Sequence, residues 1–507
     1  MAKKAFAMIA AAAVLIAGLT SCSTGGTGEV GSTDPTLKLG SIIDVASFDP
    51  AQSDVGHLMQ YLQPAYDTLI RIDENGELQP MLATAWEYTD SKNLNLKLEL
   101  RDDVKFSDGT AMTPQAVVAS LERFAAGNGP RASALASVTA YDAAEANTVV
   151  LTLASPDPAL THNLGLVAGM ITNPEVSDSD LANIPAGTGP YVLDVENTSR
   201  GDVYQFTRNA EYYDTESFPF AGLEIRLLTD PTARLNAIKT GQIDAVFGTP
   251  SQSAEAVASG LSVVSTPGDW QGLFLIDRDG KTNPAMGDVR VRQAINYAID
   301  GDAILATVAF GEGTSTTQIF YPGSPAYDES LNAAYPFDPA KAEALLAEAG
   351  YGEGLTLAMP SSDTFLADIY PIVQQQLADV GITVEYVPET PTSGLAPYLS
   401  GDLPAYAFSW GSSQNWLDAT LLLAANGGWN PLKVDDPKIS ELMNSIALAS
   451  GDEQDALYKQ LSEYVVEQAW FNPFYVVNNL YFVGPNVSVT AQAQQVVPSI
   501  YNFSPAS

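Results

Sequence analysis

Residues 66–124 read YDTLIRIDENGELQPMLATAWEYTDSKNLNLKLELRDDVKFSDGTAMTPQAVVASLERF, and this stretch decides the fold. In residues 94–100, leucine alternates with polar residues, which is the period of two typical of a strand with one buried face. Residues 107–109 (Ser-Asp-Gly) predict a turn. Thr113 is a predicted helix N-cap, and Pro114 stands at the first helical position, where a missing N–H costs nothing. The stretch therefore predicts a tight unit of strand, turn and amphipathic helix.

Parts of this stretch resemble the signature of the family 5 extracytoplasmic solute-binding proteins, the peptide- and nickel-type receptors of ABC importers. Residues 76–86 read GELQPMLATAW, and residues 100–109 read LRDDVKFSDG. Many members of that family carry histidine where Ser107 stands, which is a small departure. The resemblance continues at residues 187–193 (GTGPYVL) and 288–300 (DVRVRQAINYAID). So long a matched string is a far more specific signal than any single short motif.

The resemblance implies an α/β fold with two lobes, the periplasmic-binding-protein-like fold of type II, with an extra subdomain in the first lobe. The length of 507 residues agrees with this, because one hydrophobic core rarely extends over so long a chain. We expect the first lobe at residues 35–275, with the inserted subdomain at about 76–184. We expect the second lobe at residues 276–475 and a return of the chain to the first lobe at 476–507.

The first 21 residues predict a signal peptide. They combine two early lysines with an apolar run that is short for a membrane span. Cys22, the single cysteine of the chain, follows directly, and this arrangement resembles a lipobox, in which the cysteine is lipidated and becomes the mature N-terminus. The alternative is an ordinary secretory signal with a coincidental cysteine. Residues 22–34 are rich in Gly, Ser and Thr and predict a flexible tether that holds an extracytoplasmic domain at the cell membrane.

The charge balance excludes some partners. The chain has 23 Lys and Arg against 60 Asp and Glu, a formal net charge of −37. No basic surface is available to neutralise nucleic-acid phosphates, and electrostatic adhesion to anionic lipid is disfavoured. The negative field would favour a cationic ligand, but an acidic surface that keeps an exported protein soluble explains the same composition.

The sequence offers no motif for catalysis. It contains no serine-nucleophile elbow, no metalloprotease helix motif, no Cys–His pair and no dinucleotide loop after a strand. The glycines of residues 187–193 lack the Lys-Ser/Thr ending of a phosphate loop. The two histidines, His57 and His162, have no evident ligand cluster in the sequence. We therefore predict a protein that is not an enzyme and that holds neither a cofactor nor a metal.

Residues 407–418 (AFSWGSSQNWLD) are the strongest candidate for ligand contact, because they run from a predicted strand into a polar and aromatic loop. In the resembled family the corresponding segment lines the ligand cavity. Indoles offer a large apolar area with one hydrogen-bond donor, and polar neighbours orient a ligand. Our candidate ligand-binding residues are Trp410, Asn415, Trp416, Asp418, Trp429, Trp270 and Phe48. The alternative is that some of these tryptophans only pack the second lobe.

The cargo is left open between several classes. Dipeptide-binding relatives hold the ligand's amino terminus with an aspartate shortly after the tryptophan, and its carboxylate with an arginine before the helix that we predict at 369–380. Here residues 411–414 read GSSQ, and residues 359–363 (MPSSD) contain no arginine. A strict dipeptide receptor is therefore disfavoured, although Asp418 stands one helical turn further along. Longer peptides, oligosaccharides, opines and metal chelates remain.

We accordingly predict a monomeric, lipid-anchored receptor that captures a solute, with an oligopeptide as the preferred cargo. It delivers the solute to ABC permease subunits that work with cytoplasmic ATPases. The alternatives are a receptor for a non-peptide solute such as an oligosaccharide, an opine or a nickel chelate, and a ligand sensor without transport. A secreted hydrolase would need a carboxylate pair facing one cavity.

Overall fold

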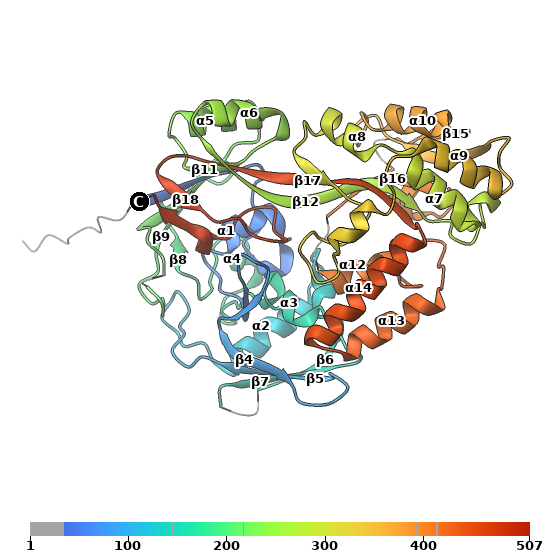
Figure 1. Ribbon diagram of the computed structural model, residues 1–507. Coiled ribbons are helices and arrows are strands. Elements are labelled where there is room, and N and C mark those ends of the chain that lie inside the picture. The colour runs from blue at the N-terminus through green and yellow to red at the C-terminus, as the bar shows by residue number, and fades with distance from the viewer. Residues whose placement is uncertain (1–34, 144–145, 216, 391–392, 412–413, 507) are drawn as a thin grey trace, which may run out of the picture. The chain divides into compact units, whose positions relative to one another are not determined.

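The computed structural model of the protein describes residues 35–143, 146–215, 217–390, 393–411 and 414–506 (Figure 1). Among these residues the largest sheet has nine strands. In spatial order they are β16 (Ala405–Trp410), β12 (Ser262–Leu275), β17 (Phe471–Val483), β11 (Ala245–Phe247), β1 (Thr36–Ser41), β10 (Gly222–Leu227), β9 (Val203–Arg208) and β8 (Tyr191–Leu193), with β13 (Gly313–Ser315) paired to β17. β1 pairs in parallel with β10 and β11, and the other pairs are antiparallel.

Two long strands, β12 and β17, lie side by side through this sheet (Figure 1). The first part of β12 pairs only with β17, whereas Trp270–Leu275 pair with β16 on one side and, up to Phe274, with β17 on the other. The register shifts between Pro267 and Trp270. At Gly272 the two strands approach so closely that an added Cβ would lie 2.3 Å from the carbonyl oxygen of Asn472. Position 272 of β12 therefore requires a glycine.

The buried apolar side chains of the described residues form four separate cores. The first core takes residues from β1, β8, β9, β10 and the segments before β8, together with the C-terminal residues Val487, Val497, Ile500 and Phe503. A smaller core beside it lies under α5 (Pro231–Lys239) and α6 (Ser253–Ala258). Two further cores draw all their buried members from residues 270–476. The last segment of the chain thus packs with its first half.

The stretch at residues 83–153 forms a separate four-stranded sheet in the order β4 (Ala83–Tyr88), β5 (Asn95–Leu100), β7 (Thr148–Leu153) and β6 (Val138–Asp142). The leucines of β5 at 96, 98 and 100 are buried, as their alternation predicts. The helix α2 (Pro114–Ala126) follows, and the backbone N–H of Ala116 donates to Oγ1 of Thr113 at 3.2 Å. The predicted strand, N-cap and helix are confirmed.

Residues 56–72 contain short elements. A 3-10 turn precedes α1 (Met59–Leu62), and β2 (Ile70–Ile72) pairs with β3 (Leu78–Pro80). Directly before β2, the N–H of Leu69 donates to the carbonyl of Gly169 and the carbonyl of Leu69 accepts from Ala83, instead of joining a regular ladder.

Three of the other helices begin at capping signals in the sequence. Helices α5, α7 (Val289–Ala298) and α9 (Pro339–Glu348) each begin after an aspartate whose side chain accepts a backbone N–H of the first turn. The other helices are α3 (Leu160–Asn163), α4 (Asp178–Leu181), α8 (Gly301–Val308), α10 (Tyr370–Asp379), α11 (Ala396–Leu399), α12 (Asn415–Leu422), α13 (Pro437–Leu448) and α14 (Gly451–Glu467). Two further strand pairs are β14 (Leu355–Ser361) with β15 (Ile382–Pro388), and β18 (Val487–Val489) with β19 (Phe503–Pro505).

In the described part of the chain, no helix has the length and apolar character of a membrane span.

Candidate functional site

The candidate site lies where β16 ends and the chain passes into α12. Trp410 is the last residue of β16 and is paired directly with Trp270 of β12. The side chain of Gln414, the N-cap of α12, accepts the backbone N–H of Leu417 at 3.0 Å, and the helix begins at Asn415, five residues after the end of the strand. The strand end and the first turn of the helix are therefore held together at one edge of the large sheet.

An aromatic cluster surrounds this strand end, and we define it as Phe274, Tyr406, Phe408, Trp410 and Trp429. The ring centroids of Trp410 and Trp429 lie 5.1 Å apart at an interplanar angle of 84°, and those of Phe408 and Trp429 lie 4.7 Å apart. Phe408, Trp416 and Trp429 keep part of their surface exposed, whereas Trp410 is buried. The partly exposed rings offer apolar area of the kind that ligand sites use.

Polar side chains lie beside the aromatic cluster. The indole N–H of Trp410 donates to Oδ1 of the buried Asp418 at 3.1 Å, so the two residues fix one another. The Ser409 hydroxyl donates to Oδ2 of Asp269 at 3.2 Å, and burial raises the pKa of this carboxyl group. Asn415 is only 6% exposed, and its Oδ1 accepts no hydrogen bond from the described residues. Two carboxylates and one free acceptor are thus gathered around the indoles.

Residues from the first half of the chain also contact helices that follow α12. The Nδ2 group of Asn93, in the loop between β4 and β5, donates to the carbonyl of Ala447 in α13 at 3.4 Å. Tyr458 of α14 is buried, and the pKa of its phenol is raised, first by burial and then by three carboxylates: Asp455, Asp418 and Asp157. Asp157 follows β7 and so belongs to the part of the chain that packs into the first core. Carboxylates from both halves of the chain therefore contribute to the raised pKa of Tyr458.

The structure brings together four of the candidate residues, Trp410, Asn415, Asp418 and Trp429, with Trp416 one residue into α12. Trp270 is fully buried, and its ring stacks on Phe274 at 4.8 Å. Phe48 is also fully buried but lies elsewhere, in the first core, 5.9 Å from the ring of Tyr204. Cys22 lies outside the described residues.

Sequence reasoning missed Asp269, Asp157 and Tyr458. The sequence does contain a signal for Asp269. Asp269 directly precedes Trp270, and Trp270 pairs with Trp410 across the sheet. Asp157 and Tyr458 carried no such signal, since they stand about 300 residues apart and only the tertiary structure brings them close.

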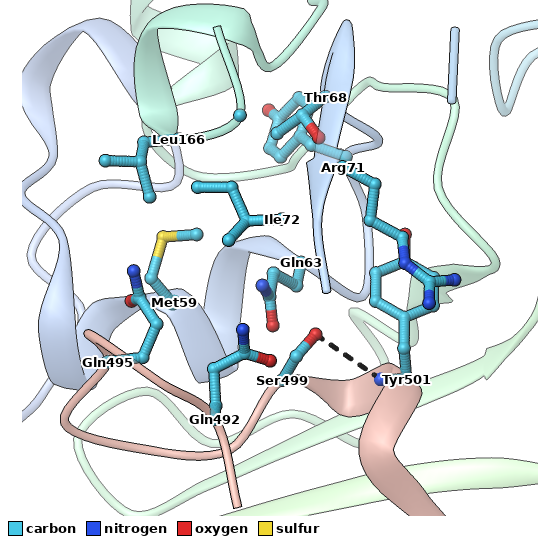
Figure 2. Close-up of a pocket in the computed structure, with 12 residues that line it drawn as sticks. Met59, Gln63, Thr68, Arg71, Ile72, Leu166, Gln492, Gln495, Ser499 and Tyr501 are labelled. Carbon is cyan, nitrogen blue, oxygen red and sulfur yellow. Dashed lines mark hydrogen bonds between the residues drawn. The ribbon is translucent and has the colours of Figure 1, made fainter. Parts of the chain in front are cut away.

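Two hollows of the described structure lie away from the aromatic cluster. Figure 2 shows a cavity of about 20 Å³ between β2 and the C-terminal segment, with Arg71 lying along the ring of Tyr501 and the backbone N–H of Tyr501 donating to Oγ of Ser499. This volume holds about one water molecule. A groove of about 320 Å³ lies between α7, α9 and α14, but its ammonium group, Lys341, already donates to the hydroxyl of Tyr297 at 2.6 Å.

The two histidines lie apart from this site. The ring of His57 meets Phe247 edge-on at 4.8 Å, and burial together with the charge of Arg234 lowers its pKa to about 4. His162 is buried, and burial lowers its pKa to about 4 as well. Within the described ranges, no group of three or more His, Cys, Asp or Glu side chains is arranged to hold a metal ion.

Comparisons with known proteins agree with this architecture. Residues 77–431 match the family model described as "Bacterial extracellular solute-binding proteins, family 5 Middle". The glutathione-binding protein GsiB of Salmonella typhi is 26% identical over 465 residues, which cover 87% of this chain and 89% of that protein. The unliganded open form of MppA, a periplasmic murein tripeptide binding protein, superposes with a TM-score of 0.81 at 20% identity, covering 95% of this chain and 99% of MppA. NikA from Brucella suis, solved with Fe(III)-EDTA, gives a TM-score of 0.79 at 24% identity, covering 93% and 100%. The two structural matches establish the two-lobe fold.

Proposed function

The chain belongs to the family 5 bacterial extracellular solute-binding proteins, which serve ABC importers, and on this premise we propose that it captures an oligopeptide at the candidate site and delivers it to a permease. The observation that carries the proposal is the aromatic cluster with its adjoining acceptors, Asp418, Asp269 and Asn415. Indole and phenyl faces suit varied side chains, and carboxylate and amide oxygens accept hydrogen bonds from a peptide's N–H groups.

We further propose that residues 35–275 and 476–507 form one lobe and residues 276–475 the other. The separate cores support a division into two lobes, and β17 contributes buried side chains to cores of both. A solute that contacts both lobes only when they are close shifts the population towards the closed form, because it binds that form more tightly. Binding is then the signal that the permease reads.

A peptide cargo is supported by two relatives as well as by the site. GsiB is described as binding glutathione, and MppA as binding a murein tripeptide. Both ligands combine peptide bonds with charged groups. The absence of an arginine from residues 359–363, where dipeptide-binding relatives hold the ligand's carboxylate, favours a longer peptide that is bound mainly through its backbone. Native mass spectrometry of the protein purified from its own host tests the proposal by identifying the co-purified solute.

Replacing Trp429 with alanine is expected to weaken binding of that solute about 10- to 100-fold, because a partly exposed indole of the aromatic cluster is lost. Isothermal titration calorimetry on the mature protein measures this change. Trp86→Ala is the matched control, since Trp86 is also a partly buried indole but lies on β4, packed against the first core. Equal affinities for the wild type and Trp429→Ala would remove Trp429 from the site.

We also propose that Cys22 carries the lipid anchor. The replacement Cys22→Ser is expected to move the protein from the membrane fraction to the soluble fraction, because no other anchor is evident in the sequence. Cell fractionation and mass spectrometry of the N-terminal peptide measure the outcome. A Cys22→Ser protein that still sediments with membranes contradicts the assignment.

A further inference from the structure

A hydrogen bond joins the tip of the β4–β5 hairpin to the end of α13, and we propose that this contact is a latch that favours the closed form of the protein. Nδ2 of Asn93 donates to the carbonyl oxygen of Ala447 at 3.4 Å, across 354 positions of the sequence. Under the lobe division proposed above, Asn93 belongs to the first lobe and Ala447 to the second. The inference rests on the proposed function, because a latch has an effect only in a protein whose lobes open and close.

The hairpin tip holds Asn93 in an ordered turn. The side chain of Asp90 accepts three backbone N–H groups of this tip, from residues 92, 94 and 95, at 2.9, 3.1 and 2.8 Å. The backbone N–H of Asn93 donates to the carbonyl of Asp90 at 3.2 Å. Asn93 has a φ of 52°, in the left-handed region that asparagine tolerates better than most residues other than glycine. Because the turn is already fixed, forming the contact with α13 costs little further backbone entropy.

The acceptor of the contact lies at the end of a helix that needs capping. Ala447 is in the last turn of α13, where the backbone carbonyls have no N–H partner within the helix. The preceding carbonyl, that of Ile446, accepts from Nε2 of Gln454 at 2.9 Å, so it is capped from α14 of the same lobe. The carbonyl of Ala447 takes its donor from Asn93 instead. A side chain of the first lobe thus caps a helix of the second, where the partial negative charge of the helix end favours a donor.

The latch acts on the balance between the open and closed forms. Both of its groups meet water when the lobes separate, so one neutral hydrogen bond at a half-buried position favours the closed form about 2- to 10-fold. The contact does not involve the solute. In a protein that is mainly open when empty, it therefore strengthens the binding of every solute by the same factor. A residue that contacts the solute has, by contrast, an effect that depends on the chemistry of the solute.

The test measures closure of the empty protein by cross-linking. In a mature Cys22→Ser protein, which has no other cysteine, Lys92→Cys and Leu448→Cys place one thiol directly beside each partner of the latch, at two exposed positions. Bound solute is removed by unfolding in urea and refolding. A short bis-maleimide joins the two thiols fastest when the lobes are closed, so the cross-linking rate, measured on denaturing gels, reports the closed population.

Three substitutions are compared in this background. Asn93→Gly keeps the left-handed turn and removes only the amide. Asn93→Asp keeps the size of the side chain but replaces the donor with an oxygen that faces the carbonyl of Ala447. Asn147→Gly is the matched control, because Asn147 has a φ of 55° directly before β7 in the same sheet and is exposed.

We expect Asn93→Gly to lower the cross-linking rate about 2- to 10-fold and Asn93→Asp to lower it at least as far. We expect Asn147→Gly to cross-link like the protein with both asparagines. Equal rates with and without the Asn93 amide overturn the inference, as does a fall in Asn147→Gly as large as that in Asn93→Gly.

Failure of the latch and failure of the proposed function are distinguishable. A co-purified solute that is released by Trp429→Ala, together with cross-linking rates that do not respond to Asn93→Gly, contradicts the latch and supports the carrier function. A protein that co-purifies with no solute and cross-links at the same rate in every variant contradicts both.

Discussion

Replacing Trp270 with alanine is expected to lower the free energy of unfolding by about 3–5 kcal/mol, the range for removal of a large aromatic side chain from a core. The indole is fully buried, stacks on Phe274 at 4.8 Å and meets Phe471 edge-on at 5.9 Å. Trp270 lies in the part of β12 that pairs with β17. Its removal would therefore leave a cavity where the two long strands are joined. This outcome would assign Trp270 to the core rather than to the ligand.

Trp270→Phe provides the graded comparison. Its cost is expected to be smaller than that of alanine, because phenylalanine keeps part of the stacking, and the buried Nε1 of Trp270 has no hydrogen-bond partner among the described residues to lose. Urea unfolding followed by circular dichroism measures both variants, with Trp429→Ala as the control at a partly exposed position of the same cluster. If Trp270→Ala unfolds like the wild type but loses the solute, the core assignment is wrong and Trp270 contacts the ligand.

The second large effect is expected at Asp67, where asparagine should remove a pH dependence of stability. Asp67 is fully buried, and it accepts hydrogen bonds from the hydroxyls of Tyr501 at 2.9 Å and Tyr212 at 3.2 Å. Burial raises the pKa of its carboxyl group to about 7, against 3.8 for the ordinary group, and the hydrogen bonds offset only part of that rise. Tyr501 lies in the C-terminal segment, so this carboxyl group connects that segment to the part of the chain just before β2.

The sign follows from proton linkage. The folded protein keeps the Asp67 proton up to a pH of about 7, whereas the unfolded chain releases it near 3.8, so stabilisation is complete below 3.8 and is lost as the pH rises through 7. Relative to Asp67→Asn, the wild type is expected to lose about 2–3 kcal/mol of unfolding free energy between pH 5 and pH 8. The neutral amide resembles the protonated acid at every pH.

Urea unfolding at pH 5, 6, 7 and 8 measures this difference directly. Asp102→Asn is the matched control, because Asp102 is an exposed carboxylate, and its curve should run parallel to that of the wild type. A difference between the wild type and Asp67→Asn that does not change with pH would show that Asp67 ionises normally in the folded protein.

Much of the local structure could be predicted from residues close together in the chain. The alternation of residues 94–100 predicted β5, and Thr113 with Pro114 predicted the start of α2. Gly241 and Gly350 end α5 and α9 in the left-handed conformation that glycine adopts without strain. These signals are local because a capping hydrogen bond or a buried strand face is decided within a few residues.

The family could also be predicted from the sequence, because residues 76–86 and 100–109 carry its signature and the match extends over residues 77–431. Local patterns do not account for the backbone just before β2. There the backbone of Leu69 bonds to Gly169 and Ala83 instead of extending a strand. A partner 100 residues away leaves no mark on the local pattern.

The charge and shape of the candidate site were decided by tertiary structure alone. The sequence singled out Trp410 and Asp418, which are eight residues apart and hydrogen-bonded. It did not single out Asp269, whose bond from Ser409 spans 140 residues, or Asp157, whose charge contributes to the raised pKa of Tyr458 from the other half of the chain. Nor did it separate the buried Trp270 from the partly exposed Trp429. Which side chains share a site depends on strand pairing and on how the two halves pack, and both are set by burial summed over the whole chain rather than by any one segment.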